Sequence, residues 1–141
     1  MFAVKSGMSV QETQEVMEAY FQDLFSGGPY ARHFADDMVL SLMWTDQVAH
    51  GPEEAQRMID LMHKQAFAAA PTLTAMCVGA GKAIAELVFV AKHIGEFAHI
   101  AATGKGVNVP YCAVYDLAEG KITALRLYLP MQELLRQIGF A

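Results

Sequence analysis

The stretch TLTAMCVGAGKAIAELVFVAKH, residues 72–93, decides the fold of this chain. Two runs rich in apolar and β-branched residues flank the turn Gly79-Ala80-Gly81, a pattern that predicts a β-hairpin. Further along the chain, Gly-containing turns separate two more runs of the same kind. The expected strands cover residues 72–78, 82–93, 107–117 and 121–129.

The chain before this hairpin predicts helices with one intervening strand. Ser9 followed by Glu12 has the spacing of a capping box, and apolar residues then recur at helical spacing as far as Gly27. The elements expected next are a short helix at 30–34, a strand at 39–46, a helix from Pro52 to about Ala70 and a last helical turn at 131–138. Helices followed by a run of strands predict an α+β fold, with the helices on one face of an antiparallel sheet.

Length and composition fit one domain, expected to cover residues 9–141, with residues 1–8 disordered or foreign to it. The chain has 141 residues, of which 54% are hydrophobic and 18% are charged, enough to bury a full core. Its formal charge is -5 and it has no run of Lys or Arg, so nucleic acid is not expected as a partner. Charged residues interrupt each apolar stretch before it reaches the roughly 20 residues of a membrane span, so no membrane partner is expected either.

The Cys, His and Gly residues give no sign of a metal or cofactor site. The five His residues are too scattered for a zinc site, and Gly79-Ala80-Gly81 lacks the helix that follows in a dinucleotide fingerprint. We therefore expect no metal and no cofactor. Cys77 and Cys112 are not needed as a disulfide framework, which favours a reducing, cytoplasmic setting.

Both faces of the late strands are apolar. Val88 and Val90 alternate with Leu87 and Phe89, so one face of the sheet can pack on the helices while the other also needs a cover. We expect this second face to join two copies of the chain in a homodimer.

A family resemblance comes from the segment AKHIGEFAHIAATGK, residues 91–105. It resembles the GTHTGEF…GIPPTGK stretch of the SnoaL-like polyketide cyclases, and EGKI at 119–122 and LLRQIG at 134–139 follow at the expected distance. FADD at 34–37 is similar to the broader nuclear transport factor 2-like superfamily, which includes ketosteroid isomerases and limonene-epoxide hydrolases. The resemblance covers about residues 10–139 and implies a cystatin-like cone, a curved sheet wrapped by the N-terminal helices around an apolar pocket.

The catalytic residues of the families resembled transfer poorly to this chain. The acid-base aspartate of the cyclases corresponds to Pro130, and the base aspartate of the ketosteroid isomerases corresponds to Leu42. The second acid of the isomerases falls near Cys112 and Ala113. Their oxyanion-binding tyrosine does have a counterpart, Tyr20. The resemblance therefore implies the fold without the usual carboxylates.

Strand alternation predicts which residues face the pocket, because every second residue of a strand shares a face. The row that ends at His93 opposes a row with Glu86 and Lys92, so His93 is expected to point inward. On the last strand, the row with Ile122 and Arg126 is expected to point inward. The predicted catalytic residues are Tyr20, Asp46, His93 and Arg126. The predicted substrate-binding residues are Leu42, Trp44, Phe89, Tyr111, Tyr115 and Tyr128.

These residues suggest an enzyme that moves protons at the carbon next to a carbonyl group, in a cyclisation, isomerisation or dehydration of a small apolar substrate. Tyr20 would donate a hydrogen bond to the developing enolate oxygen. His93 or Asp46 would carry the proton. Arg126 would orient a polar substituent of the substrate or keep the carboxylate ionised.

Each candidate also has a purely structural interpretation. Asp46 near a strand end fits a solvated turn, His93 fits a core histidine, and the tyrosines fit a core with their hydroxyls at water or backbone. Arg126 fits an ion pair with Asp46, Asp116 or Glu86. The alternative function is a protein of the same fold that binds an apolar ligand or another protein without catalysis, which the missing carboxylates favour.

Overall fold

The computed structural model describes residues 7–139 of the chain, so the expectation for residues 1–8 falls mostly outside the described residues. The helices are α1 (Val10–Ser26), α2 (Gly51–Asp60) and α3 (Met131–Gln137), with a 3-10 turn η1 (Tyr30–His33) and a π-helical turn η2 (Leu61–Gln65). The strands are β1 (Phe34–Leu42), β2 (Val48–His50), β3 (Phe67–Ala69), β4 (Thr72–Gly79), β5 (Lys82–His93), β6 (Gly106–Ala118) and β7 (Lys121–Tyr128).

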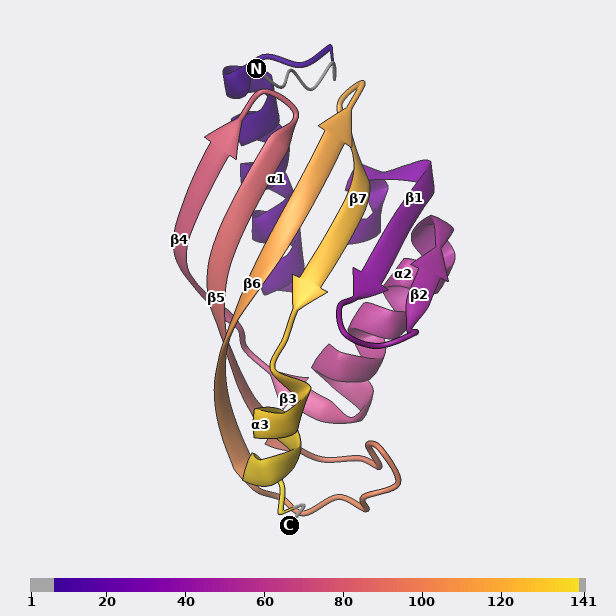
Figure 1. Cartoon of the computed structure of the whole chain (residues 1–141), viewed down its shortest axis with the longest axis vertical. Coiled ribbons are helices and arrows are strands. Elements are labelled where there is room, and N and C mark those ends of the chain that lie inside the picture. The colour runs from indigo at the N-terminus through magenta and orange to yellow at the C-terminus, as the bar shows by residue number, and fades with distance from the viewer. Residues whose placement is uncertain (1–6, 140–141) are drawn as a thin grey trace.

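The strands form one sheet in the order β2-β1-β7-β6-β5-β3, with β4 also paired to β5. Neighbouring strands are antiparallel except β1 and β7, which are parallel, so the sheet is mixed rather than purely antiparallel. Figure 1 shows α1 behind the upper part of the sheet, α2 beside β1 and β2, and the long strands β5 and β6 curving down towards α3. The predicted α+β fold is confirmed.

Helix α1 begins and packs as its sequence predicts. The Ser9 side chain accepts a hydrogen bond from the Glu12 N–H, and the Glu12 side chain accepts one from the Ser9 N–H, which completes the capping box. Its buried face includes Thr13, whose hydroxyl donates to the Ser9 carbonyl and accepts from the N–H of Gly81 at 2.9 Å. This bond attaches the start of α1 to the turn between β4 and β5.

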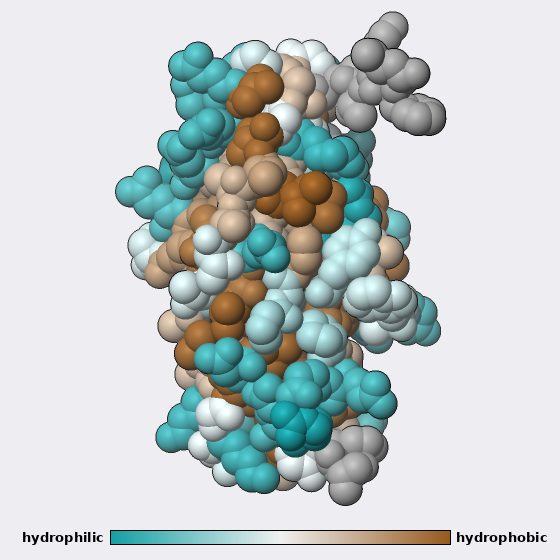
Figure 2. Space-filling view, turned by 60° about the vertical axis from the view of Figure 1, so that its left-hand side comes forward, coloured by the Kyte–Doolittle hydropathy of each residue, from teal (hydrophilic) through white to brown (hydrophobic). Residues whose placement is uncertain are grey.

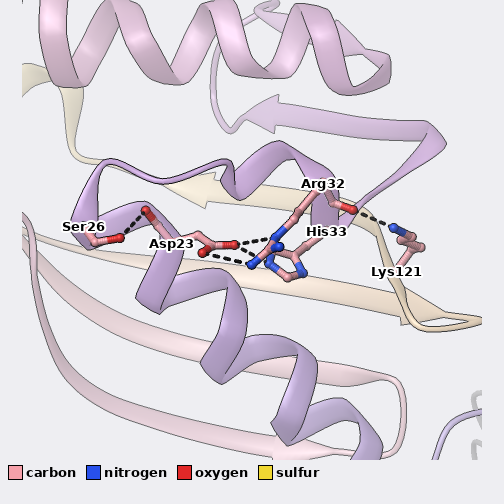
Figure 3. A network of polar contacts seen from close by, with 5 residues as sticks. All are labelled: Asp23, Ser26, Arg32, His33 and Lys121. Carbon is pink, nitrogen blue, oxygen red and sulfur yellow. Dashed lines mark hydrogen bonds and ion pairs between the residues drawn. The ribbon is translucent and has the colours of Figure 1, made fainter.

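A polar cluster attaches the other end of α1 (Figure 3). Arg32 donates from Nε and Nη2 to the Asp23 carboxylate at 2.9 and 3.2 Å, and His33 Nε2 lies 2.7 Å from Asp23 Oδ2. The His33 contact, with help from Arg32, holds the pKa of Asp23 below its ordinary value. Lys121 donates to the Arg32 carbonyl at 2.6 Å, so the cluster also reaches the start of β7.

The second helix ends earlier than predicted. The chain leaves the α-helix after Asp60 and makes a π-helical turn, closed by a 2.7 Å bond from the Ala66 N–H to the Leu61 carbonyl. It does not continue to Ala70, because residues 67–69 form β3 and pair with the end of β5. Tertiary strand pairing here overrides the local helix signal.

The first strand ends earlier too. Strand β1 stops at Leu42, whose carbonyl accepts the hydroxyl of Thr45 at 2.7 Å in a tight turn. Trp44 in this turn has a φ of 63°, a backbone conformation that bulky residues rarely adopt. Residues 43–46 therefore form a loop and are not part of the strand.

One bulge changes which residues of β7 face the helices. The pairing of β6 with β7 shifts between the pairs Leu117–Ile122 and Asp116–Ala124, which leaves Thr123 as an extra residue. Ile122 is buried, but beyond the bulge the inward residues are Leu125 and Leu127. Unbroken alternation predicts the opposite face for the rest of this strand.

None of the helices between residues 7 and 139 is long and apolar enough to span a membrane.

Candidate functional site

An apolar cavity of about 70 Å³ lies between the sheet and two helical segments, α1 and the continuous segment formed by α2 and η2. This is several times the roughly 10–15 Å³ that one water molecule needs, and about half the 150 Å³ of an engineered cavity that binds benzene. Its wall comes from α1, α2, η2 and the strands β1, β5, β6 and β7. The lining residues are Tyr20, Phe21, Leu24, Leu42, Met58, Ile59, Met62, His63, Leu87, Phe89, Tyr111, Tyr115, Leu125, Leu127 and Leu129.

Three of the four polar side chains on this wall are tyrosines. Tyr20 comes from α1, and Tyr111 and Tyr115 lie four residues apart on the inward face of β6. The rings of Tyr20 and Tyr115 are in edge contact, with centroids 5.8 Å apart. Within residues 7–139, no hydrogen bond engages any of the three hydroxyls, so all three can serve a guest in the cavity.

Burial keeps these tyrosines protonated. It raises the pKa of Tyr20, Tyr111 and Tyr115 well above the ordinary value, because an apolar wall disfavours the phenolate. The neighbouring phenols add to this effect at Tyr20 and Tyr115. Each hydroxyl therefore has a proton to donate at neutral pH.

His63 is the fourth polar group and comes from the π-helical turn η2. Its ring lies 6.2 Å from that of Phe89, centroid to centroid. Burial lowers the pKa of His63 to about 4, although Asp60 nearby acts in the opposite direction. No hydrogen bond to the imidazole occurs in the described part of the chain. At neutral pH His63 thus has one free nitrogen lone pair beside the cavity.

A second hollow, of about 350 Å³, lies on the other side of His63. Leu24 and His63 line both the cavity and the hollow, so these two side chains stand between them. The hollow is more polar than the cavity, because Asp60 and Lys64 lie on its wall. Tyr30 donates to Asp60 Oδ1 at 2.8 Å and fixes that carboxylate. The hollow therefore offers polar groups next to the apolar cavity, from which Leu24 and His63 separate it.

Half of the predicted site residues lie on the cavity wall. They are Tyr20, Leu42, Phe89, Tyr111 and Tyr115. The structure brings these side chains together from three strands and one helix, and their roles stay predictions.

The inward positions predicted for Asp46 and Trp44 are wrong. Both residues follow the end of β1 at Leu42, so strand alternation no longer applies to them. Asp46 is exposed, as its structural interpretation expects, and 78% of Trp44 is accessible to solvent.

Arg126 and Tyr128 lie on the outer face of the sheet, because the bulge at Thr123 reverses their orientation. Arg126 forms a bidentate pair with Asp116 at 2.8 and 3.2 Å, and Lys82 approaches the same carboxylate at 2.7 Å. The hydrogen bond from Arg126 lowers the pKa of Asp116. Tyr128 packs against Trp44 with ring centroids 5.6 Å apart. The predicted inward position is wrong for both residues.

His93 is fully buried but does not line the cavity. Its Nδ1 lies 2.9 Å from Thr103 Oγ1 and accepts the Thr103 N–H at 3.2 Å. The parity prediction is right that its side chain points inward. Its ring instead lies beside that of Phe67, a member of a second apolar cluster, with centroids 5.3 Å apart.

The predicted site residues include none from the second helical segment, residues 51–65. Met58, Ile59, Met62 and His63 all lie on the cavity wall. Their spacing of three and four residues puts them on one helix face, so this signal is present in the sequence.

No group of three or more His, Cys, Asp or Glu side chains in residues 7–139 has a geometry that could hold a metal ion.

Comparisons with known proteins give a family for the chain and several similar folds. The family model described as SnoaL-like polyketide cyclase matches residues 15–138. Among solved structures, one assigned as a SnoaL-like polyketide cyclase from Jannaschia sp. CCS1 is 14% identical, with 99% of each chain covered and a TM-score of 0.83.

Two further structures show the range of named activities on this fold. One assigned as a polyketide cyclase from Xanthomonas campestris pv. campestris is 20% identical over 92% of this chain and 98% of that chain, with a TM-score of 0.78. A limonene-epoxide-hydrolase-like epoxide hydrolase from M. tuberculosis is 14% identical over 92% and 90%, with a TM-score of 0.70. No curated protein sequence matches the chain. At these identities the structural likeness establishes the fold alone.

Proposed function

Because the chain belongs to the SnoaL-like polyketide cyclase family, we propose that it is an enzyme that moves a proton at the carbon next to a carbonyl group of a flat, apolar compound. The observation that carries this proposal is the pairing of unbonded, protonated tyrosines with one neutral histidine on a single apolar wall. Removal of the proton leaves an enolate, whose charge falls mainly on oxygen.

The tyrosines supply what the enolate oxygen needs. Tyr20 and Tyr111 donate hydrogen bonds to the oxygen as negative charge develops on it. In a water-poor site one such donor typically lowers the activation barrier by about 3–4 kcal/mol. Tyr115 lies against Tyr20 and supports its position.

His63 replaces His93 and Asp46 as the proton carrier of this proposal. It takes the proton from the carbon through its free lone pair and returns it to another atom of the same molecule. Isomerisation and the closure of a ring by an enolate both begin with this step. The direct alternative, a carboxylate base, has no candidate among the cavity-lining residues of the described chain.

Two measurements test the proposal. The first is deuterium incorporation next to the carbonyl group of 2-tetralone or 1-phenyl-1,3-butanedione in D₂O, followed by ¹H NMR. The wild-type chain should accelerate it, and His63→Gln should lower the rate by about a hundredfold or more. Equal rates for the two proteins would reject His63 as the base.

The second measurement is the binding of 2-naphthol, whose phenolate resembles an enolate. Tyr20→Phe should weaken binding by about tenfold, which corresponds to roughly 1.4 kcal/mol. Tyr128→Phe is the matched control, because it removes the same hydroxyl from the outer face. The donor role of Tyr20 is wrong if the two variants bind equally well.

A second function, ligand binding without catalysis, is favoured by the absence of a carboxylate from the lining residues within the described chain. It predicts an apolar molecule that co-purifies with the protein and is recovered unchanged after long incubation. Appearance of an isomerised or cyclised product would reject it.

We further propose that two copies pair through the outer face of the sheet. Ile84 and Val90 on β5 are exposed there, and Figure 2 shows brown, hydrophobic surface between teal regions along the molecule. Light scattering should give twice the chain mass, and a monomer mass in dilute solution would reject the dimer.

The free thiols of Cys77 and Cys112 suit a reducing compartment, for which we propose the cytoplasm.

A further inference from the structure

The segment His93-Ile94-Gly95-Glu96-Phe97, which carries the family resemblance, lies against the π-helical turn that presents His63. The N–H groups of Ile94 and Gly95 both donate to the carbonyl of Ala66, at 2.9 and 3.0 Å. Ala66 in turn donates to Leu61 at 2.7 Å and so closes the turn η2. One continuous chain of hydrogen bonds therefore runs from the segment into the turn.

Gly95 allows this approach. A Cβ atom at Gly95 would lie 2.3 Å from the carbonyl oxygen of Gln65, the last residue of η2. Real Cβ atoms do not come this close to a backbone oxygen, and backbone cannot swing aside as a side chain can. Only glycine permits the present distance between the segment and the turn.

Aromatic contacts hold the segment on both sides of Gly95. The rings of His93 and Phe97 lie 5.3 and 5.2 Å from the ring of Phe67, which follows η2 in the chain. Thr103 holds the other edge of His93, since its N–H donates to Nδ1. The segment is thus fixed to the residues at the end of the turn and to the return strand of its own loop.

His93 also has a polarity that packing alone does not require. Nδ1 accepts the Thr103 N–H, and Nε2 is buried without a partner in the described residues. A buried polar nitrogen without a partner destabilises the folded state. The bond that holds the loop at Nδ1 is thus made although Nε2 on the same ring has no partner.

A π-helical turn is rare and gains nothing over an α-helical turn by itself, so it persists where its surroundings hold it. In this chain the turn carries His63, which lies at the boundary between the cavity and the outer hollow. We infer that Gly95 and His93 are positioning residues that keep the turn 61–65 in its π form and thereby hold His63 at the cavity. This inference rests on the proposed role of His63, but its test uses no substrate.

The test is the imidazole pKa of His63, measured by NMR in the wild type and in two glycine variants. Gly95→Ala should push the turn away, expose His63 to water and raise its pKa from about 4 towards the ordinary value by about one unit or more. Gly79→Ala is the matched control, because its Cβ would meet nothing closer than 3.8 Å. The inference is overturned if Gly95→Ala leaves the pKa of His63 unchanged.

Hydrogen exchange of the unmodified chain provides a second test that does not depend on the variant folding. The amides of Ile94, Gly95 and Ala66 should exchange with similar protection, because they open as one unit. An Ala66 amide that exchanges about tenfold faster than that of Gly95 would refute the connection. If the connection holds but His63→Gln leaves the reaction rate unchanged, then the proposed function fails and the positioning role stands.

Discussion

Acid should destabilise this protein partly because His63 gains a proton on unfolding, and the substitution His63→Gln should remove that part of the effect. The folded state holds the pKa of His63 at about 4, while the unfolded chain has the ordinary value of about 6.5. Between these two values the unfolded state binds a proton that the folded state does not. The free energy of unfolding is therefore unaffected by His63 above pH 6.5 and falls as the pH drops from 6.5 towards 4.

The size of the effect follows from the pKa difference. One pKa unit corresponds to about 1.4 kcal/mol, so the full loss approaches about 3 kcal/mol, and about 2 kcal/mol of it is reached by pH 5. Urea unfolding at pH 7.5, 6 and 5, followed by circular dichroism, measures it. Wild type should lose about 2 kcal/mol more than His63→Gln between pH 7.5 and pH 5.

The comparison with His63→Gln isolates this one group. Hydrogen bonds from His33 and Arg32 lower the pKa of Asp23, and those from Arg126 and Lys82 lower the pKa of Asp116; both acids weaken the fold at low pH, but they do so equally in both proteins. His50→Gln is the control for the substitution itself, because His50 is exposed and should behave as wild type. Unfolding curves of wild type and His63→Gln that shift in parallel with pH would refute the buried, neutral state of His63.

Three further substitutions check the fold and the corrected orientations. Thr13→Val leaves the N–H of Gly81 without its acceptor, so urea unfolding should show a loss of about 1–3 kcal/mol, and Thr13→Ser should restore most of it. Ser9→Ala removes the cap of α1 and should cost about 1 kcal/mol by the same assay; a stability equal to wild type would contradict the cap. Arg126→Met acts on the outer face, so titration should give a 2-naphthol affinity within about twofold of wild type, whereas a large loss would return Arg126 to the site.

The sequence predicted the elements well where local signals agree with tertiary pairing. The capping box at Ser9, the hairpin around Gly79-Ala80-Gly81 and the inward rows of β5 and β6 depend on nearby residues, and the structure contains all of them. The parallel pairing of β1 with β7 could not be predicted in this way, because no local pattern encodes which distant strand β1 lies beside.

The site was predicted less completely, for two local reasons. A single extra residue at Thr123 reverses the facing of Arg126 and Tyr128, and nothing in the alternating apolar pattern of β7 marks it. On the helical side, the cavity wall includes His63, which the π-helical turn carries. His63 shares a helix face with Ile59 and Met62, so attention to that face, rather than to histidine spacing for metals, could have found it.

The low pKa of His63 has a consequence for catalysis. A general base works best when its pKa is near the working pH, and a base of about 4 is weaker by roughly three units, or about 4 kcal/mol at pH 7. One or two tyrosine donors, at about 3–4 kcal/mol each, are enough to offset this deficit. The tyrosines are therefore expected to matter more here than beside a stronger base.

The pH dependence of the reaction distinguishes this arrangement from one with an ordinary histidine. The neutral imidazole is the active form, so kcat/KM for deuterium incorporation should be constant above about pH 5 and fall below it as His63 gains a proton. The tyrosines stay protonated throughout this range because burial raises their pKa. A profile of rate against pH between 3.5 and 8 measures the acid limb. If the limb is centred near 6.5, the base is a solvated histidine, and the cavity wall described above does not perform the chemistry.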